Sequence, residues 1–299
     1  MSWHYSIPPI YTEKNFFYVT QIKKGEFLEI SLQKNAHYKI GRQLKKSGGY
    51  RIIYKPDNEL KKILKLVYKN YLVKISLPTF VHCGVRNRSI STSVQGHNKF
   101  TYHKSLDIAA FFDKVTVFTL QDSLIAAGLP SVVVTKILEL CTEDNHLPQG
   151  FPTSSFLSSL VLCVALEETV LGLRDMGIKF SAYADDILIS SNQAESLNLG
   201  EKLIKEALEK VGLSLNDKKQ TWDKISNETT LGINLHPFPR INRIKIKQLQ
   251  KALYDNKKNK LTETELKVIR GKISFYSSVN KNKLTQKVKK AVGEQIKNS

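Results

Sequence analysis

Two adjacent carboxylates, Asp185 and Asp186, stand between two strongly β-forming runs, and this pair restricts the fold of the chain more than any other feature. The segment KFSAYADDILISS (179–191) predicts two strands joined by a tight turn at the aspartates, although it offers no Gly or Asn for that turn. Adjacent like charges on a tight turn repel each other unless a cation compensates them. Mg²⁺ is the usual compensation for carboxylates, so the segment predicts a metal-binding hairpin.

A third carboxylate, Asp107, lies in an apolar run where a lone charge is costly. KSLDIAAFF (104–112) predicts a short buried strand followed by a turn. Two metal ions about 4 Å apart need a bridging carboxylate, and Asp107 is the best candidate for it. The alternative is that Asp185 and Asp186 form a solvated turn and that Asp107 caps a helix. The joint occurrence of both features favours a two-metal centre.

Charge is distributed unevenly along the 299 residues, whose net charge is +19. Residues 1–106 carry a net charge of +14, residues 107–239 of −8 and residues 240–299 of +13. Two basic arms around an acidic centre indicate a polyanion held at both ends, with metal ions at the carboxylates between them. The alternative is solvated surface charge, and the strongly basic balance favours nucleic acid.

Composition excludes several classes of protein. A hydrophobic content of 41% predicts a folded chain. The sequence contains no run of 18 apolar residues, so we expect no membrane span, and the N-terminus lacks a secretion-signal pattern. Three cysteines without CxxC spacing (Cys83, Cys141 and Cys163) predict neither a disulfide framework nor a zinc site, and they fit a reducing cytoplasm.

Hydrophobic periodicity predicts a mixture of helices and strands, which indicates an α+β fold. Helices are expected over 59–72, over 120–142, from about Thr153 to just before Gly177, over 198–213 and within the Lys-rich 243–299. In the 198–213 helix the expected apolar face consists of Leu199, Leu203, Leu208 and Val211. Short strands are expected before Pro56 and in TTLGINLHPFP.

Five strings in one order, LDIAAFF, LPQGFPTS, YADD, LNDKKQ and TLGINL, resemble the successive palm motifs of reverse transcriptases, and most closely those of the bacterial retron type. Upstream, YRIIYKP resembles the fingers motif of that family, and GVRNRSI with the following His97 resembles the segment before its first palm motif. The resemblance runs from about Tyr50 to Leu235, and the last sixty residues match only as a basic helical thumb. Two retron elements are altered: Asn-Ala-x-x-His keeps only its His, at His97, and Val-Thr-Gly keeps only its Gly, at Gly232.

The resemblance implies an RNA-directed DNA polymerase with the α+β right-hand fold, an antiparallel palm sheet and a helical thumb. The implied domains are fingers and N-terminal region in 1–106, palm with part of the fingers in 107–239, and basic helical thumb in 240–299. Asp107, Asp185 and Asp186 would hold two Mg²⁺ ions. We expect the thumb to bind RNA by its phosphates through Lys257, Lys258 and Lys260.

The resemblance also implies a nucleotide site. Arg51 would bind the triphosphate, Phe112 would crowd the sugar 2′ position, and Gln149 with Gly150 would form a loop over the incoming nucleotide. Lys219 would lie near the leaving pyrophosphate, with a register uncertain by one because Lys218 precedes it. The corresponding alternatives are a surface strand arginine, ordinary core packing of the phenylalanine, and a helix-entry turn in LPQG.

The implied partners are a structured non-coding RNA that serves as template and primer, deoxynucleoside triphosphates, the RNA–DNA product (msDNA) and a defence effector protein, in a bacterial cytoplasm. Priming from a 2′-hydroxyl and a role in anti-phage defence would follow from the retron type. The first alternative is another bacterial reverse transcriptase, of the abortive-infection or diversity-generating type. The second is a non-catalytic RNA-binding protein with a relic palm.

His82, His97 and His103 form no zinc pattern, and we expect structural or RNA-contacting roles for them.

Overall fold

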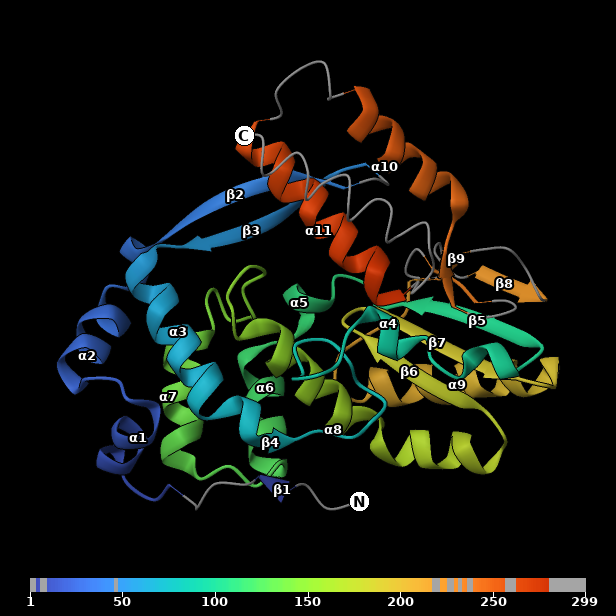
Figure 1. The fold of residues 1–299 in the computed structure, drawn as a ribbon. Helices are drawn as coiled ribbons and strands as arrows, with labels where there is room; N and C mark the ends of the chain where they lie inside the picture. The colour runs from blue at the N-terminus through green and yellow to red at the C-terminus, as the bar shows by residue number, and fades with distance from the viewer. Residues whose placement is uncertain are drawn as a thin grey trace.

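The computed structural model describes residues 4–5, 10–45, 48–216, 221–224, 229–230, 233–235, 239–255 and 262–279. Its centre is a four-stranded sheet with the order β6-β7-β5-β8 (Figure 1). The strands are β5 (Tyr102–Asp107), β6 (Lys179–Tyr183), β7 (Asp186–Ser191) and β8 (Thr221–Lys224). All three strand pairs are antiparallel, as the sequence predicts.

Both faces of this sheet are covered. In β7, Ile187 and Ile189 point into the main core, on the side of helices α8 (Ser154–Asp175) and α9 (Ala194–Glu209). Leu188, between them, points to the other face, because successive side chains of a strand alternate. There it packs in a second apolar cluster with Val94, Ile233, Leu235, Ile241 and Ile246. Burial on both faces fixes the register of the strands, because a one-residue slip would exchange the two faces.

Helix α8 runs through the middle of the main core. It begins directly after Thr153 and ends before Gly177, as the sequence predicts. By length and composition alone it could cross a membrane, but 56% of its most apolar window is buried inside the fold. A core helix passes the same test, and the packing of α8 gives it that role. Its buried Ser159 hydroxyl donates to the carbonyl of Cys83 at 2.7 Å.

Further helices around this core are α1 (Glu13–Thr20), α2 (Lys24–Leu32), α3 (Asn58–Asn70), α6 (Val117–Ala126) and α7 (Ser131–Cys141). The sequence predicts α3 but neither α1 nor α2, and the stretch expected over 120–142 is divided into α6 and α7 at Gly128 and Pro130. Asp57 precedes helix α3 and caps it, because its carboxylate accepts from the backbone N–H groups of Glu59 and Leu60. It buries one apolar stripe and leaves its lysines exposed, which confirms the helix expected over 59–72.

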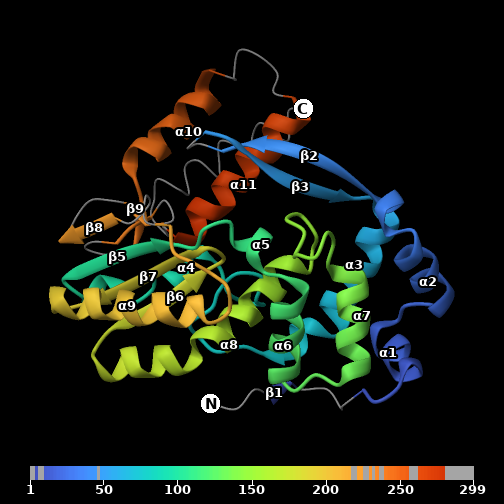
Figure 2. The ribbon, with the colours of Figure 1, turned by 180° about the vertical axis from the view of Figure 1, so that it is seen from behind.

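A separate hairpin consists of β2 (Tyr38–Leu44) and β3 (Tyr50–Pro56), paired over their full length. Both ribbon views show it extending away from the top of α3 and over α5 (Phe111–Lys114) (Figures 1 and 2). Its base is held where Tyr54 N–H donates to the carbonyl of Gln149 at 2.8 Å. The next residue, Gly150, has φ +120°, and a Cβ there would collide with the Tyr54 carbonyl. The sequence predicts β3 but gives no sign of β2.

The C-terminal part contains two of the expected Lys-rich helices, α10 (Arg243–Asp255) and α11 (Glu263–Val279). Both views place them on the same side of the sheet as the β2–β3 hairpin (Figures 1 and 2). Short strands precede them: β9 (Thr229–Thr230), β10 (Ile233–Asn234) and β11 (Arg240–Ile241) form a small antiparallel sheet. The remaining short elements are β1 (His4–Tyr5), β4 (Ile75–Ser76) and α4 (Ile90–Ser93).

The predicted apolar face of α9 is wrong at its N-terminal end. Leu199 is 49% exposed, and the helix instead buries Leu197, Gly200, Ile204, Ala207 and Leu208. Gly200 is the reason, since a Cβ there would lie 3.0 Å from a methyl of Ile178 and 3.1 Å from one of Leu173. The helix approaches the core most closely at a residue without a side chain, so counting large apolar residues misplaces the face.

Candidate active site

The adjacent aspartates lie at the turn between β6 and β7. Tyr183 pairs with Asp186 across the strands, so Ala184 and Asp185 alone form the turn. Ala184 has φ +53°, a left-handed conformation that L-residues with a Cβ adopt only at a cost. Such strain persists where the surrounding structure imposes it, and here it holds Asp185 at the end of the sheet.

Asp107 reaches the same end of the sheet from β5. It is the last residue of that strand, stands directly opposite Asp186 and is 8% exposed. The N–H of the next residue, Ile108, donates to the carbonyl of Asp185 at 2.8 Å. The structure therefore brings the three predicted aspartates together from two neighbouring strands and their turn.

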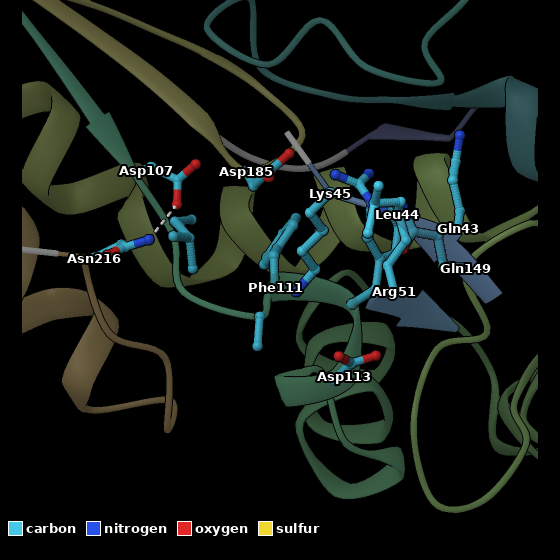
Figure 3. A pocket seen from close by; sticks show the side chains of 13 residues that line it. Gln43, Leu44, Lys45, Arg51, Asp107, Phe111, Asp113, Gln149, Asp185 and Asn216 are labelled. Atoms are coloured by element: carbon cyan, nitrogen blue, oxygen red, sulfur yellow. Dashed lines mark hydrogen bonds between the residues drawn. The ribbon is translucent and has the colours of Figure 1, made fainter. Parts of the chain in front are cut away.

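Asn216 joins this group, although the sequence analysis assigned it no role. Its backbone N–H donates to the carbonyl of Asp107 at 2.7 Å, and its side-chain Nδ2 donates to Asp107 Oδ2 at 3.2 Å. Figure 3 shows the second of these bonds as a dashed line. Asn216 belongs to the LNDKKQ motif. That motif marks the segment, but only the fold shows that its asparagine orients a carboxylate.

The edge of the sheet next to the turn is supported by residues 77–88. Ala182 in β6 accepts from His82 N–H at 2.9 Å and donates to the carbonyl of Phe80 at 2.7 Å. The guanidinium of Arg88 donates to three carbonyls of this segment, those of Leu77, Pro78 and Val81. The GVRNRSI string therefore fixes the strand that leads to Asp185.

A cavity of about 630 Å³ lies between the β2–β3 hairpin and two of the three aspartates, Asp107 and Asp185, whereas Asp186 is not part of its lining. Of the predicted site residues, Arg51, Asp107, Phe112, Gln149 and Asp185 line it, and Gly150 lies under the hairpin base. Figure 3 shows Asp107 and Asp185 on one side and Arg51 and Gln149 across from them. Lys219, Lys257, Lys258 and Lys260 lie outside the described residues.

The two phenylalanines after Asp107 differ in burial. Phe111 is 3% exposed, whereas Phe112 is half-buried and borders the cavity. The turn expected after the strand is present: Ala110 turns the chain with φ +48°, and both rings lie on the short helix α5. Phe111 reaches the core because of this helical turn.

The donors in the cavity are oxygens that suit a hard divalent cation. Asp107 and Asp185 supply carboxylates, while Lys45 and Arg51 stand on the hairpin side, an arrangement that suits a metal-bound polyphosphate. In the described part of the chain, three His, Cys or carboxylate ligand atoms lie within 4.8 Å of one another only at half-buried His37 and exposed Asp57 and Glu59. Asp57 there caps α3, so that set has a structural explanation. The three aspartates are spaced more widely than this limit.

Two of the three histidines singled out in the sequence, His97 and His103, make buried contacts within the sheet. His97 is buried between two serines, with Nδ1 2.6 Å from Ser190 Oγ and Nε2 3.0 Å from Ser181 Oγ. His103 Nδ1 lies 2.8 Å from the same Ser190 Oγ. Burial, with the charge of Lys179, holds the pKa of His97 well below its usual value, so the ring is neutral at neutral pH. His97 and His103 therefore link the segment before β5, β5 itself, β6 and β7.

Residues 43–235 match the family described as reverse transcriptase (RNA-dependent DNA polymerase), and the chain belongs to that family. It is therefore an enzyme of the nucleotidyltransferase class with RNA-directed DNA polymerase activity, and its mixed helix and sheet content is that of a polymerase fold. The matched range begins at the end of β2 and covers strand β3, the four-stranded sheet and all residues that line the cavity.

Among curated relatives, the chain is similar to retron reverse transcriptases. The retron Ec86 enzyme of Escherichia coli is 29% identical over 77% of this chain and 72% of its own length. The Mx65 enzyme of Myxococcus xanthus is 26% identical over 79% of this chain and 63% of its own, and the Ec83 enzyme of Escherichia coli is 25% identical over 80% and 82%. The resemblance to the retron type expected from the sequence is confirmed.

Proposed function

We propose that the chain copies a structured RNA into single-stranded DNA at the cavity between the β2–β3 hairpin and the carboxylate end of the sheet, by two-metal-ion nucleotidyl transfer. One observation carries this proposal. The cavity is lined at once by Asp107 and Asp185, by Arg51, and by Phe112 and Gln149, which the resemblance connects with metal, triphosphate, sugar and base.

The three aspartates are the proposed metal ligands. Reverse transcriptases use divalent metal ions, and the oxygen donors here fit Mg²⁺. When bound, two such ions activate the attacking hydroxyl and neutralise the leaving pyrophosphate. Asp107 would keep one orientation because Asn216 holds its Oδ2, and Asp185 and Asp186 would be placed by the strained turn.

The hairpin side is the proposed nucleotide clamp. The Arg51 guanidinium offers a planar fork of donors that matches phosphate oxygens. Gln149 and Gly150 would lie over the incoming nucleotide, with Gly150 permitting the close approach of β3. Phe112 would exclude a 2′-hydroxyl by occupying its space, since a ring cannot hydrogen-bond the group it crowds. Lys219 is proposed next to the pyrophosphate from the motif alone.

The proposed domains follow the right-hand arrangement: fingers in 1–106, palm in 107–239 and thumb in 240–299. The position of the hairpin over one end of the sheet, with α10 and α11 on the same side, supports it (Figure 1). Strand β5 begins at Tyr102, so the palm sheet takes in five residues before that boundary. The thumb lysines Lys257, Lys258 and Lys260 are proposed to bind RNA phosphates with strong salt dependence.

Similarity to several retron enzymes supports retron msDNA synthesis, with priming from a 2′-hydroxyl of a dedicated RNA in a bacterial cytoplasm. A role in anti-phage defence with an effector protein belongs to the same proposal. Sequencing the nucleic acid that co-purifies with the protein separates this type from other bacterial reverse transcriptases. A 2′,5′-branched RNA–DNA molecule supports the retron type, and unbranched complementary DNA would contradict it.

Primer extension on an RNA template tests the activity and the site together. Wild-type protein should extend a DNA primer with Mg²⁺ and lose this activity with a chelator. Asp185→Asn should abolish extension and leave folding and RNA binding intact, because loss of one carboxylate removes a metal ligand while it relieves repulsion in the metal-free protein. Near-normal extension by folded Asp185→Asn would sink the assignment of the site.

A further inference from the structure

A second cavity, of about 680 Å³, lies at the opposite end of β6 from the aspartates. Its walls come from residues 78–82, residues 92–100 and residues 167–181, which end α8 and begin β6. No residue that lines the carboxylate cavity lines this one. The proposed polymerase chemistry therefore leaves the second cavity unexplained.

The walls of the second cavity are held rigidly. The three bonds from Arg88 to the carbonyls of Leu77, Pro78 and Val81 fix the first wall. His82 Nδ1 in that wall lies 2.8 Å from Thr92 Oγ1 in the second, which ties the two together. A preformed site of this kind binds a ligand without the cost of ordering its own walls.

Three cations line the cavity: Lys99, Arg174 and Lys179. Throughout the stretches that the structure describes, none of the three forms an ion pair, and the lining contains one carboxylate, Glu167. The positive field extends to His82, whose pKa is lowered to about 4 by burial and by the charges of Arg88 and Lys179. Cations gathered around a cavity favour an anionic ligand.

The floor and rim of the cavity are apolar and partly aromatic. Phe80 and Phe180 pack edge to face at 5.5 Å in the wall, and Phe100 is half-buried beside them. Leu171 adds an exposed apolar surface. Flat apolar surfaces next to cations are the chemistry that binds unpaired nucleotides, whose bases stack while their phosphates meet the charges.

We propose that this second cavity binds an unpaired segment of nucleic acid, with a base against Phe100 and Leu171 and phosphates at Lys99, Arg174 and Lys179. The site would hold a single strand away from the point of synthesis. Its ligand would be either the RNA that is copied or the DNA that is made, because both share this chemistry. The proposal rests on the proposed polymerase function, which supplies both strands, and adds a second binding site to it.

Binding of a labelled oligouridylate, about twelve nucleotides long, measured over a range of salt concentrations, tests the proposal on the full chain. The triple variant Lys99→Ala, Arg174→Ala, Lys179→Ala should lower the slope of log affinity against log salt by about 2. The control variant Lys61→Ala, Lys65→Ala, Lys69→Ala loses the same charge from the exposed side of α3 and should change the slope little. Equal slopes in the two triple variants would overturn the site.

A local probe keeps the test informative if the triple variant folds poorly. The fluorescence of the Phe100→Trp variant should be quenched by the oligouridylate or by oligothymidylate. Whichever of the two binds more tightly shows whether the natural ligand is RNA or DNA. Absence of quenching by both, or equal displacement by polyglutamate, would overturn the proposal. The triple variant should still extend a pre-annealed primer, so loss of this binding is distinguishable from failure of the polymerase function.

Discussion

The two walls of the carboxylate cavity are built in different ways. The aspartates stand on a sheet that is covered on both faces and cross-linked by backbone hydrogen bonds. Arg51 stands on a two-stranded ribbon whose outer residues are exposed, with Leu44 at 67% and Tyr50 at 63%. A two-stranded hairpin is marginal by itself in water. The carboxylates, which need a fixed geometry, therefore lie on the sheet, which we call the restrained wall. Arg51, which would meet an arriving ligand, lies on the hairpin, which we call the adaptable wall.

The hairpin is joined tightly to the loop that precedes α8. Tyr54 N–H bonds to Gln149, and Gly150 lets the two backbones approach each other without a side chain between them. The position of the hairpin therefore depends on the loop that contains Gln149 and Gly150.

Gly150→Ala should have the broadest effect, because it acts on the contact between the hairpin and the loop below it. A Cβ would collide with the Tyr54 carbonyl at a backbone conformation that L-residues rarely adopt, which should cost about 1–3 kcal/mol and misplace the hairpin. Chemical denaturation and the dependence of primer extension on nucleotide concentration measure both effects. Gly172→Ala is the control, because Gly172 lies in α8 with nothing within 4 Å of its Cβ position. It should be neutral or stabilising by up to about 1 kcal/mol, and similar behaviour of the two variants would contradict the joint.

Asn216→Ala should act on the carboxylate wall alone. Loss of the donor to Asp107 Oδ2 frees that carboxylate to rotate, and loss of such a supporting group typically costs 10–100-fold in metal affinity. The Mg²⁺ concentration that gives half-maximal primer extension measures this loss of metal affinity. Asn192→Ala is the matched control, since Asn192 bonds to Thr101 near the other end of β5. An unchanged Mg²⁺ requirement in Asn216→Ala would remove Asn216 from the site.

Phe112→Ala should have a smaller and more specific effect. It should raise the incorporation of ribonucleotides relative to deoxynucleotides by about tenfold, the scale of a single steric contact. Phe111→Ala should instead lower stability by about 3–5 kcal/mol, because its ring is buried. The measurement is the ratio of catalytic efficiencies for a ribo- and a deoxynucleoside triphosphate with the same base. A larger change of that ratio in Phe111→Ala would mean that the wrong ring forms the wall.

The sequence predicted the restrained wall better than the adaptable one. The strands around Asp185 and the helix after Thr153 follow from local patterns, because β-formers and helical periodicity act over a few residues. Strand β2 left no clear pattern, since a ribbon with both faces largely exposed needs no alternation of apolar residues. The role of Asn216 also escaped prediction, because it depends on a contact between positions 109 residues apart.

Single-nucleotide incorporation measured in the first turnover tests the central claim, that both walls serve one reaction. Asp107→Asn should lose the chemical step and keep nucleotide binding. Arg51→Ala should need about 10–100 times more nucleotide, the effect of a lost charged hydrogen bond, with a maximal rate close to that of the wild type. Arg42→Ala, on the same hairpin but outside the cavity lining, should change neither value. A normal rate for Asp107→Asn, or an Arg51→Ala variant indistinguishable from Arg42→Ala, would contradict the account.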